Sequence, residues 1–150
     1  MCRRWTSTGP KARRTGVLVE SVAHRPARQA AMELKLRRPV STGTITGFHL
    51  RENGCTLDGE LPLPDSTVLR FSVNLEGPLG GSGGADHGTA AVPMENGTVR
   101  SVNLNGRWRR NGTTIMLRHV ADASNGWMNL DIVEWDMTGK TVTLSGYVLE

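Results

Sequence analysis

The amino-acid sequence predicts an all-β protein, an eight-stranded antiparallel up-and-down β-barrel that follows a basic N-terminal segment. The pair Asn111-Gly112 stands between two runs of β-favouring residues, as in a two-residue hairpin whose turn residues both have positive φ. Residues 67–76 alternate between apolar and polar side chains, which is the period of a strand with one buried face. Turn-forming residues recur along the chain at the spacing typical of a sandwich or a barrel.

The charge divides the chain into two parts. Residues 1–40 carry ten Lys or Arg against two Glu, and residues 41–150 carry eight against twelve acidic residues. We therefore expect a basic arm over residues 1–40 and a β-barrel domain over residues 41–150. A basic arm is most often solvated, but it could also contact nucleic acid or fold back on the mildly acidic barrel.

The expected compartment follows from the cysteines and the N-terminus. Cys2 and Cys55 form neither a disulfide framework nor a zinc-binding spacing. The first residues lack the apolar run of a signal peptide, and no window is apolar enough for a membrane span. We expect a soluble, cytoplasmic protein without a membrane partner. The four histidines are scattered singly, so no metal and no cofactor are predicted.

Residues 26–38 contain strong helix formers, and Pro39 would stop a helix there. We expect a short helix of about three turns, which could serve as a lid. The alternative is a first strand over residues 32–38, in which apolar and charged residues alternate.

Strands are expected over residues 42–49, 55–61, 67–76, 89–94, 98–109, 113–120, 127–135 and 141–149. Residues 77–88 contain six glycines and are expected to form a flexible loop, and residues 121–126 another. Closing eight strands into a barrel removes the edge strands and encloses space for one small ligand. An open sandwich is the alternative.

The alternation predicts an inward-facing apolar set that either lines a ligand pocket or simply fills the core. Its members are Leu57, Leu69, Phe71, Val73, Val92, Met94, Leu104, Trp108, Ile115, Leu117, Met128, Leu130, Ile132, Val142, Leu144 and Val148. The side chains expected to contact a substrate are Phe71, Met94, Leu104, Trp108, Leu117, Met128, Leu130 and Ile132.

Two ionisable residues, His119 and Glu134, fall in phase with the inward set. A carboxyl group at the end of an apolar strand face would be desolvated and could act as a general acid. The alternative places both at a wet rim. A slip of one residue would instead turn a different set inward, with Tyr147 on the next strand: Trp127, Asn129, Asp131, Val133 and Trp135.

Four arginines flank Trp108 in the central hairpin: Arg107, Arg109, Arg110 and Arg118. They could form a basic patch for an anionic ligand or RNA. The patch lacks the interleaved aromatic residues of a base-stacking surface, so a nucleic-acid partner is not expected.

A basic N-terminal segment followed by an eight-stranded, cofactor-free barrel resembles the small calycin-like and allene-oxide-cyclase-like barrels. Some bacterial members, in spirotetronate pathways, are [4+2] cyclases (Diels-Alderases) with an N-terminal lid. The likeness is architectural and covers residues 26–150. It implies a cofactor-independent cyclase of natural product biosynthesis that folds an apolar polyketide-like substrate for cycloaddition. Glu134, His119 or Tyr147 would then polarise a dienophile carbonyl.

The second resemblance is to PilZ domains, which bind cyclic di-GMP. Residues 24–28, HRPAR, and residues 43–55, GTITGFHLRENGC, fall roughly where that family has an arginine-rich switch and a [DN]xSxxG turn. His49 stands in place of the acid or amide, and Arg51 in place of the serine. A non-catalytic carrier of hydrophobic ligands is a further alternative. The partner predicted first is an apolar small-molecule substrate, and a homodimer is one option for the assembly.

Overall fold

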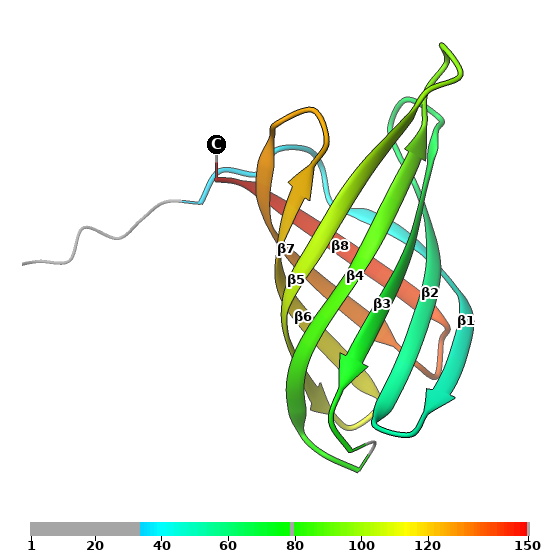
Figure 1. The fold of residues 1–150 in the computed structure, drawn as a ribbon, viewed down its shortest axis with the longest axis vertical. Helices are drawn as coiled ribbons and strands as arrows, with labels where there is room; N and C mark the ends of the chain where they lie inside the picture. The colour runs from blue at the N-terminus through cyan, green and yellow to red at the C-terminus, as the bar shows by residue number, and fades with distance from the viewer. Residues whose placement is uncertain (1–33, 79, 150) are drawn as a thin grey trace, which may run out of the picture. The chain divides into compact units, whose positions relative to one another are not determined.

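The computed structural model describes residues 34–78 and 80–149, which form one closed antiparallel barrel (Figure 1). Each strand pairs with its neighbour in the chain, and the last pairs back to the first. The prediction of an eight-stranded up-and-down barrel is confirmed, and the described residues contain no helix. The strands are β1 (Ser41–Arg51), β2 (Gly54–Pro62), β3 (Val68–Glu76), β4 (Gly83–Pro93), β5 (Val99–Asn111), β6 (Thr114–Ala123), β7 (Met128–Asp136) and β8 (Thr141–Val148).

The β5–β6 hairpin is present, but its turn lies one residue further along the chain than predicted. Asn111 pairs with Thr114, so the two turn residues are Gly112 and Thr113. Of these only Gly112 has a positive φ, 59°. Glycine with positive φ at the first turn position is typical of a type II′ turn, whose twist also suits a hairpin.

The glycine-rich stretch was predicted wrongly as a loop over its whole length. β4 begins at Gly83 and pairs with β5 along all of its residues. Glycine is needed at position 88 because the backbone of the neighbouring strand β3 is close. A Cβ on Gly88 would clash with the carbonyl oxygen of Ser72. The loop predicted after residue 120 also begins later, since β6 continues to Ala123.

Residues 35–40, which we call the strap, form an extended segment that pairs with β8, so the helix predicted to reach residue 38 is wrong there. Residues 26–33 lie outside the described residues, whereas residues 34–38 are not helical. Leu36 forms a β-bridge with Tyr147, the Val148 N–H donates to the Lys35 carbonyl, and the Arg37 N–H donates to the Gly146 carbonyl. β1 pairs with β8 only as far as Leu144, so the strap satisfies backbone groups that would otherwise form an open edge.

The barrel core consists of alternating inward side chains in which large and small residues face one another. Phe71 packs edge-on against Trp135 with ring centroids 5.3 Å apart. Opposite Phe71 stands Gly59, where a Cβ would lie 2.6 Å from the Phe71 ring. Leu57 and Leu117 are fully buried in the middle of the barrel. Most of the interior is therefore filled by side chains.

Leu57→Ala should lower the free energy of unfolding by roughly 2–5 kcal/mol, because the side chain is fully buried and its removal leaves a cavity. Urea denaturation monitored by tryptophan fluorescence measures this loss. The control is Leu50→Ala, whose side chain is exposed, and a change within about 0.5 kcal/mol is expected. Equal effects of the two changes would mean that Leu57 does not pack inside a closed barrel.

Candidate functional site

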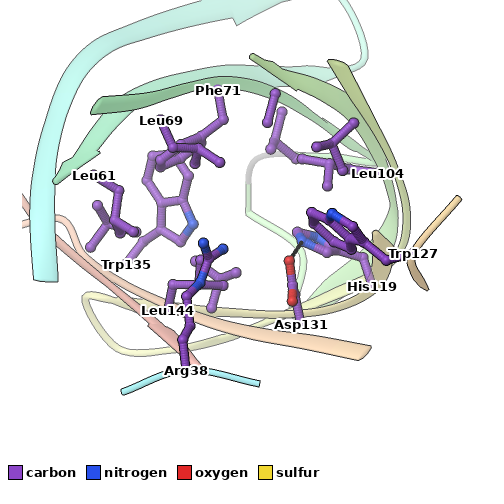
Figure 2. A pocket seen from close by; sticks show the side chains of 15 residues that line it. Arg38, Leu61, Leu69, Phe71, Leu104, His119, Trp127, Asp131, Trp135 and Leu144 are labelled. Atoms are coloured by element: carbon purple, nitrogen blue, oxygen red, sulfur yellow. Dashed lines mark ion pairs between the residues drawn. The ribbon is translucent and has the colours of Figure 1, made fainter. Parts of the chain in front are cut away.

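A small cavity of about 30 Å³ lies inside the barrel at the end crossed by the strap (Figure 2). Its lining is mostly apolar, and a volume of this size holds one or two water molecules. The lining residues are Arg38, Leu61, Leu69, Phe71, Val73, Ala90, Val102, Leu104, His119, Trp127, Asp131, Val133, Trp135, Val142 and Leu144.

A row of polar and glycine residues crosses the barrel interior beside this cavity. The strand register places Asp86, Gly106, His119, Asp131 and Gly146 opposite one another on β4 to β8. The two glycines provide the room, since a Cβ on Gly106 would lie 2.5 Å from the His119 Cβ, and one on Gly146 would lie 2.9 Å from Asp131 Oδ1. The barrel thus holds one histidine between two carboxyl groups.

The three ionisable side chains of this row are almost completely shielded from solvent. His119 Nδ1 lies 3.2 Å from Asp86 Oδ1, and His119 Nε2 lies 3.9 Å from Asp131 Oδ2. The His119–Asp131 contact is drawn as a dashed line in Figure 2. Charged groups are rarely buried in an apolar interior without a functional reason, so this cluster is the candidate site.

The strap brings a cation into the same chamber. Figure 2 shows the Arg38 side chain extending from the strap toward the interior, between Trp135 and Asp131. Its neighbour Arg37 holds the strap in place: the Arg37 Nε–H donates to Asn129 Oδ1, and the guanidinium lies 5.2 Å from the centroid of the Trp127 ring.

Several buried polar atoms at this end of the barrel have no hydrogen-bond partner among the described residues. They are Asp86 Oδ2, Asn129 Nδ2, Asp131 Oδ1 and Trp135 Nε1. Leaving such an atom unpaired costs roughly 1–3 kcal/mol, and native structures contain few of them. Two of these residues, Asp131 and Trp135, line the cavity itself. The Asn129 side chain lies close enough to Asp131 to act on it as a hydrogen-bond donor and lower its pKa. The clearest unpaired group that the chamber offers to an occupant is therefore the Trp135 Nε1–H donor.

The environment alters the acidity of two groups in the chamber. Burial raises the pKa of the Asp131 carboxyl, although the charges of His119 and Arg38 act in the opposite direction. Burial likewise lowers the pKa of the Arg38 guanidinium, and the Asp131 charge opposes this shift. A carboxyl group with a raised pKa can donate a proton or hydrogen bond when protonated and accept one when ionised.

Of the three predicted catalytic residues, the structure places only His119 in the chamber. Glu134 is exposed on the outer face of β7, and Tyr147 is half-buried on the outer face of β8, where it pairs with the strap. The prediction that Glu134 points inward is wrong. The inward face of β7 is the alternative one, with Asn129, Asp131, Val133 and Trp135 buried.

The predicted substrate-contacting residues are distributed in the same way. Phe71 and Leu104 line the cavity, Leu117 lies deeper in the core, and Met94 packs half-buried against the core. Trp108 is buried but lines a pocket elsewhere in the barrel. The β7 residues predicted to face inward are half-buried on its outer face, which corrects the prediction for Met128, Leu130 and Ile132. Register explains the error, because a shift of one residue exchanges the two faces of a strand.

Several residues of the site were not predicted from the sequence. Asp86 fell in the predicted glycine loop, and Arg38 at the end of the predicted helix. Asn129, Asp131 and Trp135 belonged to the alternative register of β7. The sequence does contain one signal for this site, because Gly106 stands opposite His119 and Gly146 stands opposite Asp131. This signal can be recognised only once the strand register is known.

The comparisons with known proteins add no family. No protein-family model matches the chain, no curated protein matches its sequence, and no solved structure matches its fold. Within residues 34–78 and 80–149, no three His, Cys, Asp or Glu side chains are grouped to hold a metal ion. The same residues contain no helix that is long and apolar enough to cross a membrane.

The raised pKa of Asp131 predicts a contribution to stability that falls as pH rises. Between the unfolded value of about 3.9 and the higher folded value, the folded state holds a proton that the unfolded state has lost. Asp131→Asn removes this dependence. The free energy of unfolding of the variant, relative to the unsubstituted protein, should therefore increase as pH rises upward from about 4. Urea denaturation across this range measures it.

The matched control is Asp65→Asn. Hydrogen bonds from the Thr67 hydroxyl and backbone N–H lower the pKa of this exposed Asp65 carboxyl, so its contribution is lost as pH falls. The stability of this variant relative to the unsubstituted protein should fall as pH rises, in the window between the lowered folded pKa and the unfolded value of about 3.9. The urea series is therefore extended below pH 4 for this control. A pH dependence of the same sign in both variants would contradict the burial of Asp131.

Proposed function

We propose that the barrel binds a small, largely apolar molecule that carries a carbonyl group, and that it does so in the strap-end chamber. The observation that carries this proposal is the set of buried polar groups inside an otherwise apolar barrel. A ligand carbonyl could accept hydrogen bonds from Trp135 Nε1 and the Arg38 guanidinium, which face the same cavity. Pockets of this kind bind through apolar walls and a few convergent polar groups.

Within this class, we propose that the protein is a cofactor-independent cyclase for an intramolecular [4+2] cycloaddition. The support is the architectural likeness to the allene-oxide-cyclase-like barrels and the presence of donors in an apolar chamber. Such an enzyme holds a linear substrate in a reactive conformation, an effect that supplies several kcal/mol. Hydrogen bonds to the dienophile carbonyl would lower the barrier further. Arg38, Trp135 and His119 take the role that the sequence analysis gave to Glu134, His119 and Tyr147.

The size of the cavity sets a condition on this proposal. A volume of about 30 Å³ cannot contain a polyketide-like substrate, for which pockets of roughly 300 Å³ or more are typical. The chamber must therefore widen when the substrate enters. The half-buried side chains of Arg38 and Trp127 are among those whose movement would widen it, while the Arg38 guanidinium stays within reach of the substrate carbonyl. The strap can move without opening the barrel, because β1 pairs with β8 independently of residues 35–37. It would act as the lid predicted for the N-terminal segment.

Two alternatives use the same fold. A non-catalytic carrier would bind the same ligand without converting it, and the chamber would have to widen in the same way to admit it. For a PilZ-like receptor the key Arg28 lies outside the described residues. His49 and Arg51, which stand at its turn motif, lie 3.1 Å from Asp58 and 2.9 Å from Glu76. Because His49 and Arg51 contact carboxyl groups of the barrel itself, nothing at this turn specifically supports binding of cyclic di-GMP.

Arg38→Ala should lower kcat for a linear polyene with a conjugated carbonyl by about tenfold or more, because a hydrogen bond from a charged donor is lost. Chromatographic measurement of the cyclised product gives the rate. Glu134→Gln distinguishes the two assignments of the site, since Glu134 lies on the outer face. Unchanged turnover in this variant agrees with the interior site.

The carrier is identified by saturable binding of the polyene without any product. If Arg38→Ala and Glu134→Gln both turn over normally, the interior donors do not act on the substrate.

A further inference from the structure

A second pocket, of about 220 Å³, opens at the other end of the barrel from the strap. The β1–β2, β5–β6 and β7–β8 connections lie at that end of the barrel (Figure 1), and residues next to them, Gly54, Thr113 and Met137, line the pocket. Its apolar lining consists of Phe48, Cys55, Leu75, Trp108, Ile115 and Met137. Phe48 is 46% exposed and lines the open side of this pocket.

The pocket is a different site from the strap-end chamber. Along β2, Leu61 lines the chamber and Cys55 lines the pocket; along β6, His119 lines the chamber and Ile115 the pocket. Between them stand Leu57 and Leu117, which line neither space and have no exposed surface. These two leucines fill the middle of the barrel, so occupancy of the pocket does not depend on the function proposed for the chamber.

The polar groups around the pocket do not call for a charged ligand. The Trp108 Nε1–H is already satisfied, since it donates to the Glu76 carbonyl oxygen at 2.9 Å. None of the buried unpaired polar atoms of the described residues belongs to the pocket lining. Burial raises the pKa of the Cys55 thiol, so this group is neutral at physiological pH. The charged Arg110 on the lining donates its Nε–H to the Gly112 carbonyl.

We propose that this pocket binds a compact, neutral aromatic or hydrocarbon molecule of about one ring with a short substituent. Size supports this class, because an apolar protein cavity of about 150 Å³ binds benzene. At about 220 Å³ the pocket is somewhat larger, and glycines rather than side chains form part of its wall at Gly54 and Gly77. Phe48 and Trp108 both line the pocket, and aromatic side chains contact aromatic ligands favourably.

The test is a titration of the full chain with toluene, followed by backbone amide NMR. Saturable shifts are expected at Gly54, Gly77 and Thr113, and none at Asp131 or Gly146 in the strap-end chamber. Shifts at the chamber alone, or shifts that do not saturate, would overturn the assignment.

Two variants and a control locate the binding. Met137→Trp fills the pocket and should weaken toluene binding at least tenfold, and Thr113→Trp, at an exposed turn position that tolerates substitution, should act in the same direction. The control Leu63→Trp adds the same bulk to a half-buried site that does not line the pocket and should leave toluene affinity within twofold. Unchanged affinity in both filled variants would exclude this pocket as the site.

A titration with benzoate separates neutral from anionic ligands. Benzoate is expected to bind at least tenfold more weakly than toluene, because the carboxylate would lose its hydration in an apolar pocket. Tighter binding of benzoate would overturn the assignment to a neutral class.

Discussion

The limited space inside an eight-stranded barrel is the constraint from which the rest of this structure follows. A barrel of this size is just wide enough for its own side chains, so some large inward groups fit only because a glycine stands opposite them. Gly59 admits the Phe71 ring in this way. The same device at Gly106 and Gly146 admits His119 and Asp131, which places ionisable groups where an apolar core would otherwise close completely.

This arrangement is costly for stability, which is why it indicates a function. Well-packed apolar residues of similar volume would often stabilise a core more than a buried group of ions does. The barrel instead encloses Asp86, His119 and Asp131, and Asp86 Oδ2 has no hydrogen-bond partner among the described residues. Arg38 extends toward this group from the strap. Departures from good core packing of this kind are concentrated at sites that bind or react.

The strap joins this chamber to the chain that precedes the barrel. It occupies the part of β8 that β1 leaves unpaired, so its position is fixed by backbone hydrogen bonds and by Arg37 rather than by a core of its own. An element held by a few backbone hydrogen bonds and one arginine can move while the eight paired strands stay closed. The chamber and the pocket at the opposite end can then serve different ligands, with Leu57 and Leu117 between them.

Local sequence patterns were sufficient for the strands and their order, because hairpin turns and a period of two are properties of neighbouring residues. Register on β7 was ambiguous: Met128, Leu130 and Ile132 are more apolar than Asn129 and Asp131, yet the latter face inward. The apolarity of the β7 residues could not decide which face points inward. Asp131 is accommodated inside the barrel because His119 on β6 and Gly146 on β8 stand beside it. The glycines around Asp86 suggested a loop, because local sequence does not show how close the neighbouring strands come. They belong to β4, where adjacent strands leave no room for side chains. The position of Arg38 depends on the unpaired edge of β8, more than one hundred residues away.

The central claim is that the strap-end chamber receives a ligand carbonyl, and the side-chain indole resonances of the tryptophans test it most directly. Trp135 Nε1 has no partner among the described residues, whereas Trp108 Nε1 is bonded to the Glu76 carbonyl. On titration with a linear polyene that carries a conjugated carbonyl, the account predicts a saturable downfield shift of the Trp135 indole proton and an unchanged Trp108 resonance. Saturable binding of the polyene that leaves the Trp135 indole proton unmoved would contradict it.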